Sequence, residues 1–113
     1  SSIEIISFSL NEYNCFEKDD LINFGNYFSL NKKLELHDNC INTFKDLIMH
    51  PKFNGVYTIT VKPLSKNSFI KIGDSKIQIT ETKDISFEIN DVSKFEIVLN
   101  NVRIKKFLYK KLQ

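Results

Sequence analysis

The chain has 113 residues, the length of a single domain, and we treat residues 1–113 as one unit. Its 16 Lys and Arg nearly balance its 14 Asp and Glu, and the net charge of +2 does not favour nucleic acid as a partner. No apolar run approaches the ~20 residues of a membrane-spanning helix, so we expect no membrane span.

The first third of the chain has weak periodicity. Residues 2–10 predict a strand in which the parity of the apolar positions changes midway. Residues 11–20 are polar and predict a loop, and residues 20–28 fit no single pattern. Short strands are expected at residues 27–30 and 33–36.

One segment has the spacing of a helix. Its apolar residues recur at intervals of three and four, at Ile41, Phe44, Leu47 and Ile48. Asn39 or Asn42 would cap its start, and Pro51 would end it. We therefore expect one short helix near residues 41–50.

The stretch from Tyr57 to Tyr109 alternates apolar and polar residues in six short runs. The runs are VYTITVK, SFIKI, KIQIT, ISFEI, FEIVL and VRIKKFLY. Because successive side chains of a strand point to opposite faces, each run has one buried face and one face in water. The pattern predicts antiparallel strands.

Turn residues separate these runs. Pro63 cannot donate to a ladder and is expected to close the first strand. Gly73-Asp74 predicts a hairpin, and we expect it to place isoleucines opposite one another: Ile72 with Ile77 and Ile70 with Ile79.

The last two runs predict a second hairpin and a bulge. Asn tolerates positive φ, so Asn100-Asn101 is expected to form a two-residue turn. That turn would pair Leu99 with Val102 and Ile97 with Ile104. The buried parity then changes between Ile104 and Phe107, which predicts a bulge near Lys105-Lys106.

Together these elements predict an all-β fold: an antiparallel β-sandwich of about nine strands with one short helix. Three stretches carry a family resemblance: 54–61 resembles a G-x-Y-T-x-T-V strand, 84–89 a W-x-x-F strand and 98–104 a closing I-D-D-V-x-I strand. The chain thus resembles the galactose-binding-like jelly roll of non-catalytic carbohydrate-binding modules. The resemblance implies a jelly-roll topology and a sugar ligand. The chain departs from the family in having Asn100-Asn101 for the acidic pair and no Trp.

A sugar site needs aromatic faces and amide or carboxylate partners for hydroxyl groups. We take Tyr13, Tyr27 and Asn14 as the candidate ligand-binding residues. Tyr57 and Tyr109 are expected to pack in the core or on a sheet face instead.

Acidic residues at the end of the predicted loop are candidate calcium ligands. Glu17, Asp19 and Asp20 supply the carboxylates that Ca²⁺ prefers, and a solvated acidic loop is the alternative. We expect no other cofactor.

The two cysteines, Cys15 and Cys40, leave two interpretations open. They form a disulfide in a secreted or surface protein, or they are two reduced thiols. With His37 and His50 they also supply the residue types of a zinc site, although only His37-x-x-Cys40 has short ligand spacing.

Basic residues concentrate in the last run, at Arg103, Lys105, Lys106, Lys110 and Lys111. One interpretation is a surface for an acidic partner or nucleic acid. The interpretation we favour is that these residues protect an exposed edge strand from pairing with other chains.

No catalytic motif occurs in the sequence, so we expect a protein that is not an enzyme. The expected function is a binding module for carbohydrate or a cell-surface ligand. The alternative is a structural virion component (phage capsid, decoration or tail) that acts through protein–protein assembly and forms a homo-oligomer. A third is a cytosolic adaptor that adds a partner strand to an open sheet edge. An extracellular, cell-surface or virion location is favoured over the cytoplasm.

Overall fold

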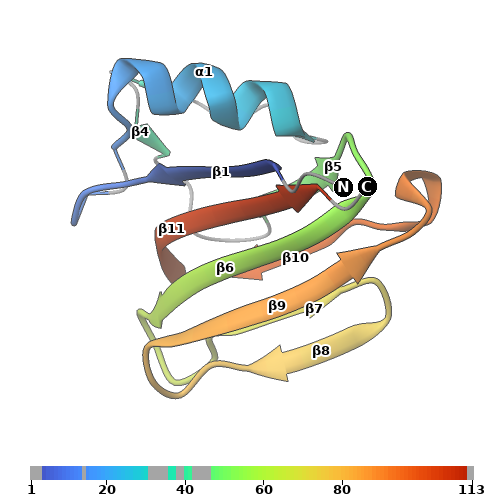
Figure 1. The fold of residues 1–113 in the computed structure, drawn as a ribbon. Coiled ribbons are helices and arrows are strands. Elements are labelled where there is room, and N and C mark those ends of the chain that lie inside the picture. Colours follow the sequence, from blue (N-terminus) through green and yellow to red (C-terminus); the bar gives the residue numbers. More distant parts are fainter. Residues whose placement is uncertain (1–3, 14, 31–35, 38–39, 42–46, 112–113) are drawn as a thin grey trace.

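The computed structural model describes residues 4–13, 15–30, 36–37, 40–41 and 47–111 (Figure 1). Two antiparallel sheets pack face to face as a sandwich, and a helix crosses one side of it (Figure 1). The antiparallel β-sandwich predicted from the sequence is confirmed. The jelly-roll topology stays a prediction.

The first sheet has four strands. In spatial order they are β1 (Glu4–Ser9), β11 (Val102–Lys111), β6 (Gly55–Pro63) and β9 (Lys83–Ile89). The second sheet has five strands, β2 (Phe28–Leu30), β5 (Leu47–Pro51), β10 (Ile97–Asn100), β7 (Phe69–Ile72) and β8 (Ser75–Gln78). A separate two-stranded sheet pairs β3 (Leu36–His37) with β4 (Cys40–Ile41).

Alternation places the core between the two sheets. On β6, Tyr57, Ile59 and Val61 are buried, while the residues between them are partly exposed. The same holds for Ile97 and Leu99 on β10. Each run predicted between Tyr57 and Tyr109 is a strand of one of the two sheets, because one face of each run can be buried against the other sheet.

The predicted bulge and strand end are both confirmed. Pro63 is the last residue of β6. The register between β11 and β6 shifts between Ile104 and Lys106, so Lys105 is the extra residue. The bulge lets Phe107 join Ile104 on the buried face, although an odd number of residues separates them.

The β7–β8 hairpin is confirmed, but its predicted register was wrong. Ile70 pairs with Ile77, and Ile72 pairs with Ser75. The chain reverses within two residues because Gly73 adopts φ +57°, a value that suits a tight turn. The predicted register would have needed a longer loop.

The predicted hairpin at Asn100-Asn101 was also wrong. Asn101 has φ +52°, but the chain there passes from one sheet to the other. Leu99 pairs with Leu47 and Ile70 inside the five-stranded sheet. Ile104 pairs with Val61 in the four-stranded sheet.

The helix lies elsewhere than predicted. It is α1 (Lys18–Tyr27), in the segment expected to be a loop and an ambiguous stretch. Residues 47–50, expected in the helix, belong to β5 (Leu47–Pro51), whose two neighbours β2 and β10 satisfy its backbone groups. Residues 42–46 lie outside the described residues. Gly25, near the end of α1, weakens the helical signal of this segment.

Phe24 is the buried side chain of α1, and it joins the helix to the sandwich. Its ring lies 5.3 Å from Phe107, 5.4 Å from Phe28 and 6.1 Å from Phe8. The helix therefore packs where β1 and β2 form the edges of the two sheets (Figure 1).

Cys15 and Cys40 form a disulfide. The bond ties the loop after β1 to β4, and no cysteine of the described chain is free. The predicted bond between the two cysteines is confirmed, and thiolate ligation of zinc by these residues is excluded. The secreted or surface location stays a prediction.

No helix in the described chain is long and apolar enough to cross a membrane.

Candidate functional site

Three connections meet at one end of the sandwich (Figure 1). They are residues 52–54 between β5 and β6, Gly73–Asp74 between β7 and β8, and residues 90–96 between β9 and β10, which include the 3-10 turn η1 (Val92–Lys94). We call this the loop end. Binding residues concentrate on loops held by a rigid scaffold, so we take the loop end as the candidate site.

Two buried tyrosines fix the turn at residues 52–54 through hydrogen bonds. The hydroxyl of Tyr57 donates to the carbonyl of Phe53 at 2.7 Å, and that of Tyr109 donates to the carbonyl of Asn54 at 2.7 Å. Burial, reinforced by Tyr109, raises the pKa of Tyr57, so the hydroxyl keeps its proton and stays a donor. The two tyrosines expected in the core are there, and they also fix this turn.

The same turn is attached to the end of α1. The backbone N–H of Lys52 donates to the carbonyl of Tyr27 at 2.9 Å, and its ammonium donates to the carbonyl of Gly25 at 2.8 Å. The last carbonyls of a helix lack partners within the helix, so Lys52 satisfies part of this helix end. The turn is thus anchored on both sides.

Gly55 is the first residue of β6 after the turn, and its lack of a side chain lets the backbone lie close against β11. Its φ of +152° lies in a region that side-chain-bearing residues rarely adopt. A Cβ atom there would lie 2.7 Å from the ring of Tyr109 and 2.8 Å from the carbonyl oxygen of Lys110. Only glycine fits without displacing β11.

This anchoring presents an exposed aromatic ring. Phe53 is 50 % exposed, and its ring packs edge-on against Tyr27 with centroids 5.4 Å apart. Tyr27 in turn lies 4.6 Å from Tyr109. Phe53 is therefore an exposed aromatic platform supported by further rings.

A small polar pocket adjoins the platform through Asn54. The pocket has a volume of about 190 Å³ and is lined by Asn54, Gly55, Glu88, Ile89 and Asn90. It offers amide and carboxylate groups next to the turn that carries Phe53.

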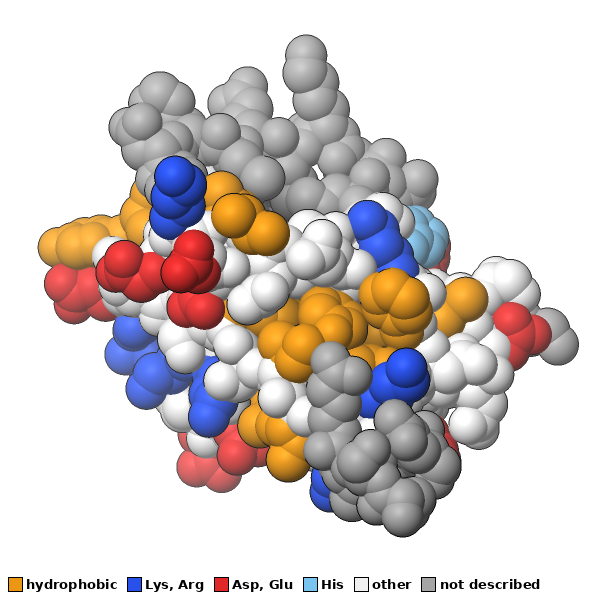
Figure 2. All heavy atoms as spheres, turned by 45° about the horizontal axis from the view of Figure 1, so that its top comes forward, with side chains coloured by type: hydrophobic (Ala, Val, Ile, Leu, Met, Phe, Trp, Pro, Cys, Tyr) orange, Lys and Arg blue, Asp and Glu red, His pale blue; other side chains and the backbone are white. Residues whose placement is uncertain are grey.

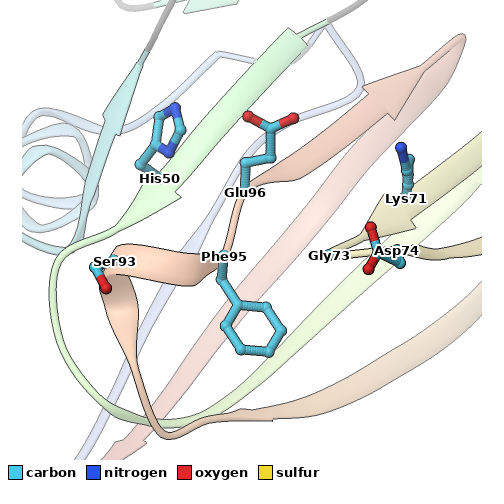
Figure 3. Close-up of a pocket in the computed structure, with 7 residues that line it drawn as sticks. All are labelled: His50, Lys71, Gly73, Asp74, Ser93, Phe95 and Glu96. Atoms are coloured by element: carbon cyan, nitrogen blue, oxygen red, sulfur yellow. The ribbon is translucent and has the colours of Figure 1, made fainter.

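A second pocket at the loop end has a volume of about 280 Å³ (Figure 3). Its lining is mostly polar: His50, Lys71, Gly73, Asp74, Ser93, Phe95 and Glu96. Glu96 immediately precedes Ile97, which pairs with Met49 on one side and Ile72 on the other, so Glu96 lies between His50 and Gly73. The side chains of His50 and Glu96 project to the same side (Figure 3). Such a mixture of donors and acceptors suits a ligand rich in hydroxyl groups.

The hydroxyl and backbone N–H of Ser93 have a structural role. Its hydroxyl donates to Asp91 Oδ1 at 2.6 Å, and its backbone N–H donates to the same oxygen at 3.1 Å. This arrangement caps η1, and it directs the hydroxyl toward a carboxylate instead of His50. The Ser93 hydroxyl is therefore directed at Asp91, and its hydrogen bond is already made.

The structure separates the tyrosines that the sequence analysis grouped. Tyr13 is 71 % exposed and lies in the loop before α1, whereas Tyr27 is the last residue of α1. A ten-residue helix is ~15 Å long, so these rings do not form one platform. Asn14 lies outside the described residues.

The candidate calcium ligands lie around the start of α1. Asp19 and Asp20 are in its first turn, where carboxylates interact favourably with the helix dipole, and Glu17 precedes it. Asp20 Oδ2 also accepts from the N–H of Ser9 at 3.3 Å. Within the described ranges, no three His, Cys, Asp or Glu side chains lie close enough to hold a metal ion. The structure thus gives these carboxylates a role at the helix start.

The basic residues of β11 do not protect an edge, because β11 lies between β1 and β6. Lys106 aligns across β6 with Asp84, and Lys110 aligns across β6 with Glu88. Figure 2, seen from the side of α1, shows basic and acidic side chains in separate small groups around a central hydrophobic area. The predicted edge-protection role was wrong, since edge position depends on sheet order.

Comparison of the chain with protein-family models, with curated proteins and with solved structures finds no match. Phe53 and the residues that line the two pockets were not predicted from the sequence as candidate sugar-binding residues, and His50 was named only as a possible zinc ligand.

Proposed function

We propose that this domain is a non-catalytic binding module that recognises carbohydrate, or another hydroxyl-rich ligand of a cell surface, at its loop end. One observation carries the proposal: Phe53 is half exposed on a turn fixed by two buried tyrosine hydroxyls.

The chemistry of sugars fits this surface. The C–H faces of a sugar ring pack on an aromatic side chain, and its hydroxyls bond to amides and carboxylates. Phe53 supplies the aromatic face, and Asn54, Glu88 and Asn90 supply polar groups beside it. Because the turn is already fixed, binding costs less ordering entropy than it would on a loose loop.

The disulfide between Cys15 and Cys40 supports the same proposal. Disulfides form and persist in oxidising compartments, on cell surfaces and on virions. Carbohydrate ligands are displayed in those places, so the disulfide and the proposed ligand indicate the same location for the protein.

The test is a broad glycan array, read with calcium and with chelator. We expect binding that is independent of calcium and is weakened at least tenfold by Phe53→Ala. Tyr13→Ala is the matched control, because Tyr13 is another exposed aromatic residue, outside the loop end. Binding that depends on Tyr13 and not on Phe53, or absence of binding to any glycan, would contradict the proposal.

Assembly with other proteins, including in a virion, is the second candidate, and β9 favours it. Within the described chain this seven-residue strand pairs only with β6, which leaves its other edge open for strand addition. Light scattering across protein concentrations tests self-assembly. A discrete mass above 13.2 kDa that persists on dilution would favour assembly over glycan binding.

A further inference from the structure

Two basic residues lie directly opposite each other at the end of the sandwich away from the loop end. Arg103 on β11 pairs in register with Lys62 on β6. Like charges directly opposite on neighbouring strands destabilise a sheet. An anion held between them would reverse the sign of this interaction.

Arg103 also has an unsatisfied donor. Its Nε atom is shielded from solvent, and within the described part of the chain it has no hydrogen-bond acceptor. Native proteins pair the great majority of their buried polar groups. The guanidinium group is a planar fork of donors that matches the oxygens of phosphate, sulfate and carboxylate groups.

One acidic residue of the neighbouring strand β9 is already engaged. Asp84 on β9 lies opposite Thr60, two residues from Lys62, and its Oδ1 accepts from the Thr60 hydroxyl at 2.6 Å. The register therefore places Lys62 next to Arg103, and it places Asp84 on a different row of the sheet.

We infer that Arg103 and Lys62 hold a tetrahedral oxyanion, the phosphate or sulfate of an ester, on the outer face of the four-stranded sheet. We call these residues the oxyanion site. It lies at the other end of β6, a nine-residue strand ~30 Å long, and does not depend on the loop end.

The test is two-dimensional NMR of the ¹⁵N-labelled full chain, titrated separately with inorganic phosphate and inorganic sulfate at constant ionic strength. We expect saturable shifts of the Arg103 side-chain Nε–H and of the Lys62 backbone amide. The Arg103→Met variant should bind at least fivefold more weakly, with Lys62→Met also impaired. Lys110→Met is the matched control, because it removes a cation from the outer face of the same strand and should bind like the wild type.

A second arm distinguishes the source of the oxyanion. A sulfated oligosaccharide that binds at least tenfold more tightly than inorganic sulfate, and more tightly than its unsulfated counterpart, would assign the site to an ester on a glycan. Equal affinity for the ester and the free ion would assign it to the free oxyanion. Shifts that do not saturate, or an equal loss in the Arg103 and Lys110 variants, would overturn the inference, because they would reflect diffuse attraction to lysines.

Discussion

Removing the Cys15–Cys40 disulfide is expected to destabilise the domain strongly. The bond joins positions 25 residues apart and ties the loop after β1 to β4. That loop includes Phe16, whose buried ring packs 5.0 Å from Phe24 of α1. The proposed change is Cys15→Ser together with Cys40→Ser.

The magnitude follows from chain entropy. Closing a loop of this length removes about 12 cal/mol/K from the unfolded chain, which is about 3.5 kcal/mol at 25 °C. With an unfolding entropy of ~2.1 cal/mol/K per residue, a domain of this size would lose on the order of 15 °C in Tm. Loss of order at Phe16 would add to this value.

Differential scanning calorimetry of the wild type and the double variant measures the effect. Wild type treated with reductant should fall to the Tm of the double variant, and the variant should not respond to reductant. Alkylation followed by mass spectrometry should find no free thiol in the untreated wild type. A Tm difference below ~3 °C between the two proteins would refute the reasoning, because it would mean that the cross-link does not constrain the unfolded chain.

Three further predictions concern the fold. Gly55→Ala should lower the free energy of unfolding, measured by urea denaturation, by about 3 kcal/mol, because the new Cβ meets the Tyr109 ring at 2.7 Å and the backbone is strained. An unchanged denaturation midpoint would show that β11 moves aside at no cost. Ser68→Ala should lower the free energy of unfolding by about 2 kcal/mol, since the fully buried hydroxyl donates to the carbonyl of Asn101 at 2.5 Å and accepts from two N–H groups. A variant as stable as the wild type in urea would contradict this. Stability should fall above pH ~10, because the raised pKa of Tyr57 keeps it neutral in the fold while the unfolded chain ionises; a denaturation midpoint that stays flat to pH 11 would argue against it.

The strands of the second half were predictable because their alternation is strong. Tyr57, Ile59 and Val61 share one parity and are buried. The change of parity after Ile104 located the bulge, since a strand can keep both apolar sets on one face only by inserting an extra residue. These features depend on local geometry, which the sequence encodes directly.

The helix was misplaced because short apolar patterns are ambiguous. Leu47 and Ile48 fit a helix with earlier residues, and Leu47 and Met49 equally fit a strand. The neighbours β2 and β10 decide the outcome, because a strand between two others satisfies its backbone groups on both sides. Phe24 of α1 packs against Phe28 of β2 only once the two sheets have come together, so this contact could not be predicted from the local pattern.

The sequence by itself determined which residues are buried along the strands of the second half of the chain, because side chains alternate with a fixed period. Only the tertiary structure decided which strands share a sheet. Asn101 has the positive φ of a hairpin turn and yet carries the chain across the sandwich, since that backbone angle suits both paths. The candidate sites depend on the same level of structure. Phe53 is exposed because tyrosines from β6 and β11 hold its turn, and Arg103 meets Lys62 because those two strands are neighbours.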